Sequence, residues 1–464
     1  MPFAGTATAA SIALPRPAAS PGVLSPSAAC RPPAAFPPPA APLRPAGDHP
    51  VSATLAANEA LAARRSQGQP VLPLAFGEAG LPAHPALRDA LAAAAARNGY
   101  GPVAGLAALR SAAAGYWQRR GLPTSPGSVV CGPGSKPLLF GLMLAAGADV
   151  AVPRPSWVSY AAQASLIGAR PHFVPAAPGD GGICDPAALA AAVTAARAAG
   201  REIRSVVVTL PDNPTGRLPR PATVRAFCDV AAEHDLIIIS DEIYRDLVHD
   251  PATPVLSPAA VAPQRTVVTT ALSKSLALGG WRIGVARLPE GALGEWLRGQ
   301  LTGIGSEIWS APAAPIQQAA ALAFSEPAEL CERIAASRRL HAAVCRAAAG
   351  LCAAAGLDVP PPQAAFYVYP DFGPWRGPLA RRHGVTTSAG LAGLLLERYG
   401  AGTLPGSVFG ERPGALRLRL ATGLLYGETG ERQEAALAAP DPLALPWIAA
   451  ELDRLGEILA DLAP

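Results

Sequence analysis

Long hydrophobic runs are absent from this chain of 464 residues. No apolar stretch reaches the length of about 18 residues that a membrane-spanning helix needs, so we expect no transmembrane segment and no membrane partner. Short apolar runs such as 236–239 end in polar residues, which is typical of buried strands. The first 50 residues also lack a basic start followed by an apolar core, which argues against a secretory signal.

A strong excess of one charge is also missing, because 38 Lys and Arg residues face 34 Asp and Glu residues. The net charge of +4 is too small to indicate a nucleic acid or another polyanion as a partner. The seven cysteines contain no CxxC pair. Their spacing indicates reduced, mostly buried thiols in a cytoplasmic protein, without a metal site.

Proline and alanine dominate residues 1–50, which contain 13 prolines and 14 alanines. We expect this segment to be a disordered tail, because proline interrupts helices and central strands alike. From residue 51 onward helical and strand patterns alternate, which favours an α/β fold with a mostly parallel sheet covered by helices on both faces. The length predicts two domains. Residues 51–97 are expected to start a smaller α+β domain, 98–335 to form the large domain, and 336–464 to complete the smaller one.

The individual elements follow from hydrophobic periodicity and from the positions of Gly and Pro. The expected strands are 129–131, 149–152, 205–210, 236–240, 266–270 and 282–286. The expected helices are 85–97, 105–119, 136–145, 186–199, 221–234, 312–354 and 446–462. Residues 424–445 are expected to form a loop, because Gly and Pro break any periodicity there.

The first candidate for a catalytic group is Lys274, in the segment Leu272-Ser273-Lys274-Ser275. A lysine between small residues after a predicted buried strand is unfavourable unless its charge is used or removed. Desolvation lowers the pKa of a lysine and makes it a nucleophile for carbonyl groups. Eight residues later, Arg282 offers a fixed cation for a phosphate. A solvated surface lysine is the other interpretation.

Two further polar segments follow expected strands. Asp241 and Tyr244 come directly after the apolar run 236–239, at a strand end where open α/β sheets bind ligands. Asn213 lies in Asp212-Asn213-Pro214-Thr215-Gly216, after the strand expected at 205–210. Taken alone, Asp241 is better explained as a cap or turn residue, and Asn213 as part of an ordinary Asn-Pro turn.

Together, the three segments resemble the class I/II (fold type I) aminotransferases, which depend on pyridoxal 5′-phosphate (PLP), and are most similar to prokaryotic aspartate and prephenate members. NPTG, DEIY and Ser-Lys with an arginine eight residues on occur in the family's order, and the resemblance runs from about residue 51 to the C-terminus. It implies that Lys274 carries PLP as a Schiff base. Asp241 would face the pyridine nitrogen, and Asn213 and Tyr244 the phenolic oxygen.

The resemblance implies further cofactor contacts. Arg282 and a Gly-rich turn at a helix N-terminus would bind the phosphate, and Trp157 would stack on the ring. Tyr100 would reach the phosphate of the neighbouring subunit, so a homodimer with shared active sites is expected. The expected cofactor contacts are Gly134, Ser135, Lys136, Trp157, Asn213, Asp241, Tyr244, Ser273, Lys274, Arg282 and, across the dimer, Tyr100.

Substrate contacts are implied in the same way. Arg417 matches the arginine that binds the substrate α-carboxylate, and Gly77 matches the N-terminal loop that closes over the substrate. Trp157 and Asn213 are also expected to contact the substrate. Arg419 follows Arg417 at a spacing of two, so on a strand both point to the same side, and Arg417 is preferred on the alignment. The pair Phe366-Tyr367 resembles a small-domain aromatic pair of the family.

Two positions depart from the family pattern. Ala271 replaces a hydroxyl residue three positions before the lysine, so either Thr269 or Thr270 compensates or phosphate binding is weaker. Ala364 replaces the usual glycine before Ala-Phe-Tyr.

The resemblance implies an enzyme of amino-acid metabolism that moves an amino group from an L-amino acid to a 2-oxo acid with ping-pong kinetics. A PLP-dependent lyase (a β- or γ-elimination, or an ACC-synthase-like reaction) is the alternative, because the same residues serve those reactions. A PLP-binding regulatory module with a DNA-binding domain is disfavoured, because residues 1–50 show no helix-turn-helix and no basic helix.

Two residues give opposite indications about the substrate side chain. Lys136 resembles a position that contacts acidic side chains in some aspartate and prephenate aminotransferases. Glu307 falls in a stretch that borders the neighbouring active site in the family, where a carboxylate favours a cationic substrate. A surface position is the other interpretation of Glu307, and the sequence names no substrate.

Overall fold

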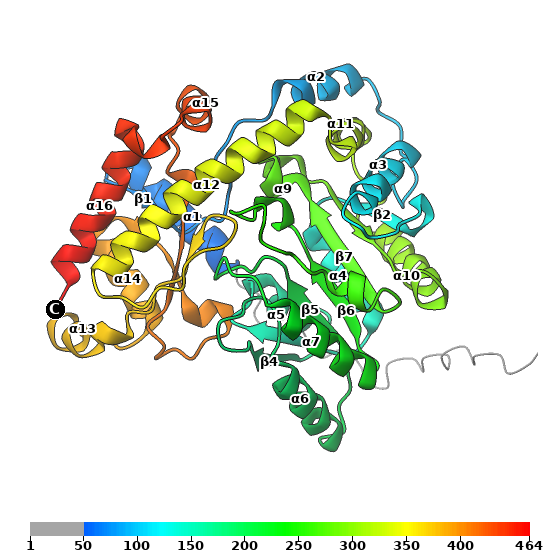
Figure 1. Ribbon diagram of the computed structural model, residues 1–464, viewed down its shortest axis with the longest axis horizontal. Coiled ribbons are helices and arrows are strands. Elements are labelled where there is room, and N and C mark those ends of the chain that lie inside the picture. The colour runs from blue at the N-terminus through cyan, green and yellow to red at the C-terminus, as the bar shows by residue number, and fades with distance from the viewer. Residues whose placement is uncertain (1–50) are drawn as a thin grey trace, which may run out of the picture. The chain divides into compact units, whose positions relative to one another are not determined.

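The computed structural model describes residues 51–464 (Figure 1). The expected disordered tail at 1–50 lies outside the described residues. The described residues all belong to one compact unit. Among them, no helix combines the length and the apolarity that crossing a membrane requires.

A seven-stranded sheet is the centre of the fold, with the strand order β2-β8-β7-β6-β5-β3-β4. The pairs from β7 to β4 are parallel, whereas β8 is antiparallel to both of its neighbours. The expected mostly parallel α/β sheet is therefore confirmed. The strands are β2 (Val129–Gly132), β3 (Asp149–Arg154), β4 (Pro171–Pro175), β5 (Ile203–Thr209), β6 (Ile237–Asp241), β7 (Thr266–Ala271) and β8 (Gly284–Arg287).

Helices cover both faces of this sheet, because successive strand residues point to opposite sides. Val207 and Ile239 pack on one side with α4 (Ser135–Ala146), α5 (Val158–Leu166) and α10 (Ala292–Ile308). Val206 and Ile238 pack on the other side with α6 (Pro186–Ala198) and α7 (Pro221–Glu233). All four side chains are fully buried, and burial of each stabilises the fold by about 1.5–3 kcal/mol.

The remaining helices of the sheet-containing region either pack near β2 and β8 or come directly after a strand along the chain. Near β2 and β8, Cys131 and Val285 pack in a core with Leu109 of α3 and Phe324 of α11. These helices are α2 (Pro85–Ala94), α3 (Ala107–Gln118), α8 (Pro258–Val261), α9 (Leu272–Ser275) and α11 (Ala314–Ser325).

A second hydrophobic core lies around the C-terminal elements. The long helix α12 (Ala328–Ala354) joins the two cores, because Leu330 packs in the sheet-side core and Leu340 in the C-terminal core. In Figure 1 this helix runs diagonally from the sheet helices toward α14 and α16. The C-terminal helices are α13 (Arg376–His383), α14 (Ser388–Tyr399) and α16 (Pro446–Leu462).

Short strands close this C-terminal core. A three-stranded antiparallel sheet has the order β11-β12-β9, and the N-terminal strand β1 pairs with β10 in parallel. Residues just after helix α1 (Ala53–Ser66) therefore join the core of the C-terminal part. The strands are β1 (Leu72–Pro73), β9 (Tyr367–Val368), β10 (Ala401–Gly402), β11 (Leu404–Pro405) and β12 (Leu418–Ala421).

The expectation of a loop throughout 424–445 is wrong, because this segment contains α15 (Gly430–Ala438). The Thr429 hydroxyl accepts a hydrogen bond from the Arg432 backbone N–H and caps the helix. Glu434 of the same helix forms an ion pair with Arg333 of α12 at 2.8 Å. A good cap and a run of alanines thus outweigh the glycine at the first helical position.

Candidate active site

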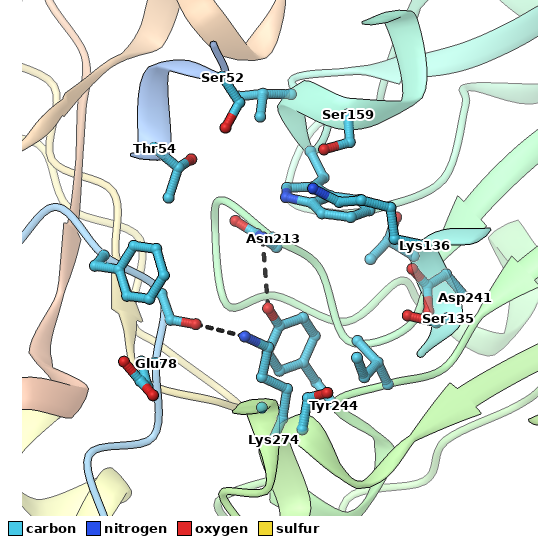
Figure 2. A pocket seen from close by; sticks show the side chains of 18 of the residues that line it. Ser52, Thr54, Glu78, Ser135, Lys136, Ser159, Asn213, Asp241, Tyr244 and Lys274 are labelled. Carbon is cyan, nitrogen blue, oxygen red and sulfur yellow. Dashed lines mark hydrogen bonds between the residues drawn. The ribbon is translucent and has the colours of Figure 1, made fainter. Parts of the chain in front are cut away.

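A cavity of about 530 Å³ opens at the carboxyl ends of β5 and β6, where Thr209 and Asp241 lie. Figure 2 shows polar side chains from the sheet, α4 and the N-terminal segment turned toward it. The structure brings most of the predicted site residues to this cavity. Those that line it are Gly77, Ser135, Lys136, Trp157, Asn213, Asp241, Tyr244, Ser273, Lys274 and Arg282.

Lys274 lies in α9, the single helical turn that directly follows β7. Its Nζ donates a hydrogen bond to the Gly77 carbonyl oxygen across the cavity (Figure 2). Burial, followed by the positive charge of Arg419, lowers the pKa of Lys274 to about 8. A larger fraction of this amine is therefore neutral near pH 7 than for an ordinary lysine, as a nucleophile for a carbonyl requires.

Asp241 is the last residue of β6 and is 2% exposed. The Tyr160 hydroxyl donates to its Oδ2 at 3.0 Å and the Thr269 hydroxyl to its Oδ1 at 3.3 Å. Burial raises the pKa of Asp241 to about 6, although the hydroxyl donors oppose this. A buried carboxylate that needs a cation suits a protonated ring nitrogen.

Asn213 and Tyr244 meet in the same cavity. Asn213 Nδ2 donates to Tyr244 Oη at 3.5 Å (Figure 2). Both side chains are at most 3% exposed, and burial raises the pKa of Tyr244. Tyr244 therefore stays protonated and can donate its proton to an oxygen anion in the cavity.

The N-terminus of α4 forms an anion cradle with Arg282. Gly134 adopts φ 94°, which favours glycine, and a Cβ on Gly284 would lie 2.6 Å from Ser135 N, so the close approach of β8 to this turn requires glycine at 284. Arg282 adopts the left-handed region at φ 54°, and its guanidinium donates to the carbonyl oxygens of Gly279 at 2.8 Å and of Pro133, beside the α4 turn, at 3.5 Å. Unpaired first-turn N–H groups beside a fixed cation suit a phosphate.

Trp157 directly precedes α5 and lines the cavity with its ring. It packs edge-to-face on Tyr160 with the ring centroids 5.3 Å apart. Lys136 Nζ lies 5.1 Å from the centroid of the Trp157 ring, and burial together with Arg282 lowers the pKa of Lys136. The cavity thus combines a ring to stack on, a carboxylate, phenolic donors, an anion cradle and a buried amine, and this set fits PLP.

The structure does not bring Arg417 to the cavity. Its side chain is 41% exposed and forms ion pairs with Asp371 at 2.9 Å and Glu411 at 2.7 Å. Arg417 lies just before the first residue of β12, where these two carboxylates already satisfy it. The position of Arg417 therefore does not support the substrate contact that the resemblance implies.

Arg419 takes the position expected of Arg417. It is 1% exposed, lines the cavity and donates from Nη1 to Asn213 Oδ1 at 3.0 Å and from Nη2 to the Ala75 carbonyl oxygen. Its Nε is buried without a partner. The spacing of two had already indicated that either arginine could serve, but the sequence does not show where β12 begins.

Other predicted residues lie outside the cavity. Tyr100 is 95% exposed and Glu307 is exposed. The hydroxyls of Thr269 and Thr270 donate to Asp241 and to the Glu242 carbonyl oxygen, so neither replaces the hydroxyl missing at Ala271. Sequence reasoning missed Ser52, Thr54 and Glu78, which also line the cavity (Figure 2).

Comparison with known proteins gives a consistent result. Residues 70–424 match the sequence profile of the family described as aminotransferase class I and II. The aspartate aminotransferase of Geobacillus stearothermophilus is 32% identical over 390 residues, which cover 82% of this chain and 94% of that protein. The probable aspartate/prephenate aminotransferase of Thermus aquaticus is 34% identical over 248 residues, which cover 52% of this chain and 63% of that protein.

A solved structure extends the similarity to three dimensions. The aspartate aminotransferase from Thermus thermophilus with maleate superimposes with a TM-score of 0.74 at 27% identity, covering 88% of this chain and 97% of that chain.

Proposed function

The chain belongs to the class I and II aminotransferases, and we propose that it uses PLP to transfer an amino group from an acidic L-amino acid to a 2-oxo acid. When bound, PLP supplies an electron sink beside the reacting carbon. Asp241 would hold the ring nitrogen, Asn213 and Tyr244 the phenolic oxygen. The cradle of Ser135 and Arg282 would hold the phosphate.

The chain's own residues then move one proton. Arg419 would bind the substrate α-carboxylate with its guanidinium and so turn the Cα–H bond toward Lys274. Lys274, with its pKa lowered to about 8 by burial and by Arg419, would take that proton as general base and return it to the cofactor. Arg419 would thus both orient the substrate and increase the fraction of Lys274 that is neutral and able to accept a proton.

Four cationic side chains of the described residues line the cavity: Lys136, Lys274, Arg282 and Arg419. With Lys274 as the base and Arg282 at the phosphate, Arg419 and Lys136 are the two that carry the inference of an acidic donor. If Arg419 binds the α-carboxylate, Lys136 remains for a carboxylate on the substrate side chain. The hydroxyl side chains Ser52 and Thr54 of the N-terminal segment line the same cavity. Glu307, which would favour a cationic substrate, is exposed in this chain, as a residue that borders a partner's site in the proposed dimer would be.

We also propose a homodimer in the cytoplasm. Tyr100 is exposed on the described chain, and in the proposed dimer it would complete the partner's phosphate site. The six described cysteines are free, which supports a reducing compartment.

Absorbance of the purified protein tests the proposal. PLP-loaded protein is mixed with L-aspartate, L-glutamate, L-ornithine or L-leucine in the absence of any oxo acid. We expect the cofactor band to convert to that of its amine form fastest with the acidic donors. The Lys136→Met variant should lose this preference and keep the cofactor.

Other outcomes would redirect the assignment. Absence of a cofactor band after addition of PLP would overturn the proposed cofactor site. Release of pyruvate or ammonia in place of the amine form would indicate a lyase. Faster conversion with L-ornithine than with L-aspartate would overturn the acidic donor alone.

A further inference from the structure

Tyr367 is a buried residue of the cavity whose hydroxyl has no part in the proton transfer described above. It lies in β9 of the C-terminal sheet, is 1% exposed and lines the cavity. Its ring packs with Phe366 and Tyr244 in a small cluster. A polar group buried at this position needs a partner, because an unpaired hydroxyl would be unfavourable.

Three contacts connect Tyr367 with other residues that line the cavity. Its Oη lies 2.6 Å from Tyr244 Oη. The guanidinium carbon of Arg419 lies 4.8 Å from the centroid of its ring. A Cβ on Gly77 would lie 2.5 Å from the Tyr367 hydroxyl, so only a glycine lets the 76–77 loop come this close. Tyr367 therefore touches the phenolic donor, the carboxylate-binding arginine and the loop that faces Lys274.

Hydrogen-bond directions follow from the number of protons. Tyr244 has one proton, and it must donate that proton to the cofactor's phenolic oxygen to serve there. In that state its oxygen can only accept from its protein neighbours. Asn213 Nδ2 lies at 3.5 Å, near the limit of a hydrogen bond, whereas Tyr367 Oη lies at 2.6 Å. Tyr367 is therefore the main donor to Tyr244 in the loaded site.

The aromatic ring of Tyr367 makes a separate contact, with Arg419. Its face lies near the Arg419 cation, which is fully buried and whose pKa burial lowers. An aromatic face stabilises a desolvated guanidinium and fixes its plane. The carbonyl oxygen of Ala75 and the amide oxygen of Asn213 accept hydrogen bonds from the same guanidinium group.

We propose that Tyr367 is a positioning residue with two separable effects: its hydroxyl donates to Tyr244 and strengthens the hydrogen bond to the cofactor's phenolic oxygen, and its ring supports Arg419 in the carboxylate site. The inference rests on the proposed function, because it assigns roles relative to PLP and to the α-carboxylate. A chain of hydrogen bonds polarises its members, so a donor behind Tyr244 makes Tyr244 a stronger donor.

Two substitutions separate these effects. Tyr367→Phe removes the hydroxyl and keeps the ring over Arg419, whereas Tyr367→Leu removes both. Tyr369→Phe is the matched control, because Tyr369 lies two residues away, is buried, has an unpaired hydroxyl and does not line the cavity. Circular dichroism and thermal melting of each PLP-loaded variant establish that it is folded.

The first readout is a pH titration of the bound cofactor's absorbance. Tyr367→Phe should raise the titration midpoint by about half a pH unit or more, because a phenolic oxygen with a weaker donor is more basic and retains the adjacent proton. Tyr369→Phe should leave the midpoint at the wild-type value. A merely structural role of Tyr367 would not move this midpoint in a folded, loaded protein.

The second readout separates KM from kcat. Tyr367→Phe should lower kcat severalfold and keep the KM for the amino acid within about twofold, whereas Tyr367→Leu should raise that KM by about fivefold or more. An unshifted midpoint in Tyr367→Phe overturns the hydroxyl's role, and an unchanged KM in Tyr367→Leu overturns the ring's role. A wild-type protein without a cofactor band would instead overturn the proposed function itself, and this inference with it.

Discussion

At the scale of single residues, two arginines two positions apart lie in opposite environments. Arg419 is buried in the cavity, and Arg417 is half-exposed between Asp371 and Glu411. We expect Arg419→Ala to raise the KM for both amino acid and oxo acid by about 100-fold, because charge-assisted hydrogen bonds to the carboxylate are lost, each worth about 1.5–3 kcal/mol. Steady-state kinetics with both substrates measures this.

Arg417→Ala is the control for that substitution, since it removes the same side chain outside the cavity. Its KM values should stay within about threefold of wild type. A larger effect on KM from Arg417→Ala than from Arg419→Ala would restore the assignment made from the alignment.

The buried carboxyl group of Asp212 leads to a second prediction, on how stability depends on pH. It is fully buried, its Oδ2 accepts hydrogen bonds from Thr215, and its Oδ1 has no partner. Burial raises its pKa from 3.8 to about 7, so the folded state binds more protons than the unfolded state between these values. Stability contributed by this group is therefore lost as the pH rises from about 4 to 7.

Asp212→Asn removes that ionisation. We expect the variant to gain thermal stability over the wild type at pH 8, with a smaller gain or none at pH 5. Melting curves at the two pH values test this, and equal changes at both would show that ionisation of Asp212 is not the cause.

Local motifs predicted most of the site, and long-range contacts explain the rest. Asp241 ends β6, Lys274 lies in the helical turn after β7, and Asn213 lies in the loop after β5. The sequence therefore places all three at the carboxyl edge of the sheet. The choice between Arg417 and Arg419 depends on where a four-residue strand begins, which periodicity does not resolve. The contact between Tyr367 and Tyr244 joins residues 123 positions apart, and no local pattern encodes it.

At the scale of elements, the close approach of β8 to the start of α4 depends on one glycine. A Cβ on Gly284 would lie 2.6 Å from the backbone of Gly134 and Ser135. We expect Gly284→Ala to weaken PLP binding by about tenfold to a hundredfold, because such overpacking costs about 1–3 kcal/mol. Cofactor titration followed by absorbance gives the dissociation constant.

Gly350→Ala is the matched substitution elsewhere in the chain. Gly350 is exposed in the interior of α12, and nothing lies within 4 Å of an added Cβ. It should stabilise the protein by up to about 1 kcal/mol and leave PLP affinity unchanged. Weakened PLP binding in Gly350→Ala would mean that the glycine change itself, rather than the cradle, is responsible.

The sequence predicted the strands that are largely buried along their length. The six expected strands are found with shifts of at most two residues at either end. Strand β4 was missed because it lies at the sheet edge and buries only Val174. Helix α15 was missed because its stability depends on the Thr429 cap and on contact with α12.

At the scale of the whole molecule, the proposed homodimer predicts complementation between inactive chains. Lys274→Ala chains and Tyr100→Ala chains are each expected to lose most activity. Mixing them after mild dissociation should restore activity, because a mixed dimer contains one site with both an intact Lys274 and an intact Tyr100. Size-exclusion chromatography with light scattering gives the oligomeric state, and no recovery from a demonstrated mixed dimer would contradict shared sites.

The division into a large and a small domain remains a prediction, and helix α12 bears on how such domains would behave. This helix of 27 residues contributes Leu330 to one hydrophobic core and Leu340 to the other. Neither core can lose its packing without removing the support of a helix that the other needs. Heating should therefore melt both regions in a single cooperative transition, with the calorimetric and van't Hoff enthalpies in agreement.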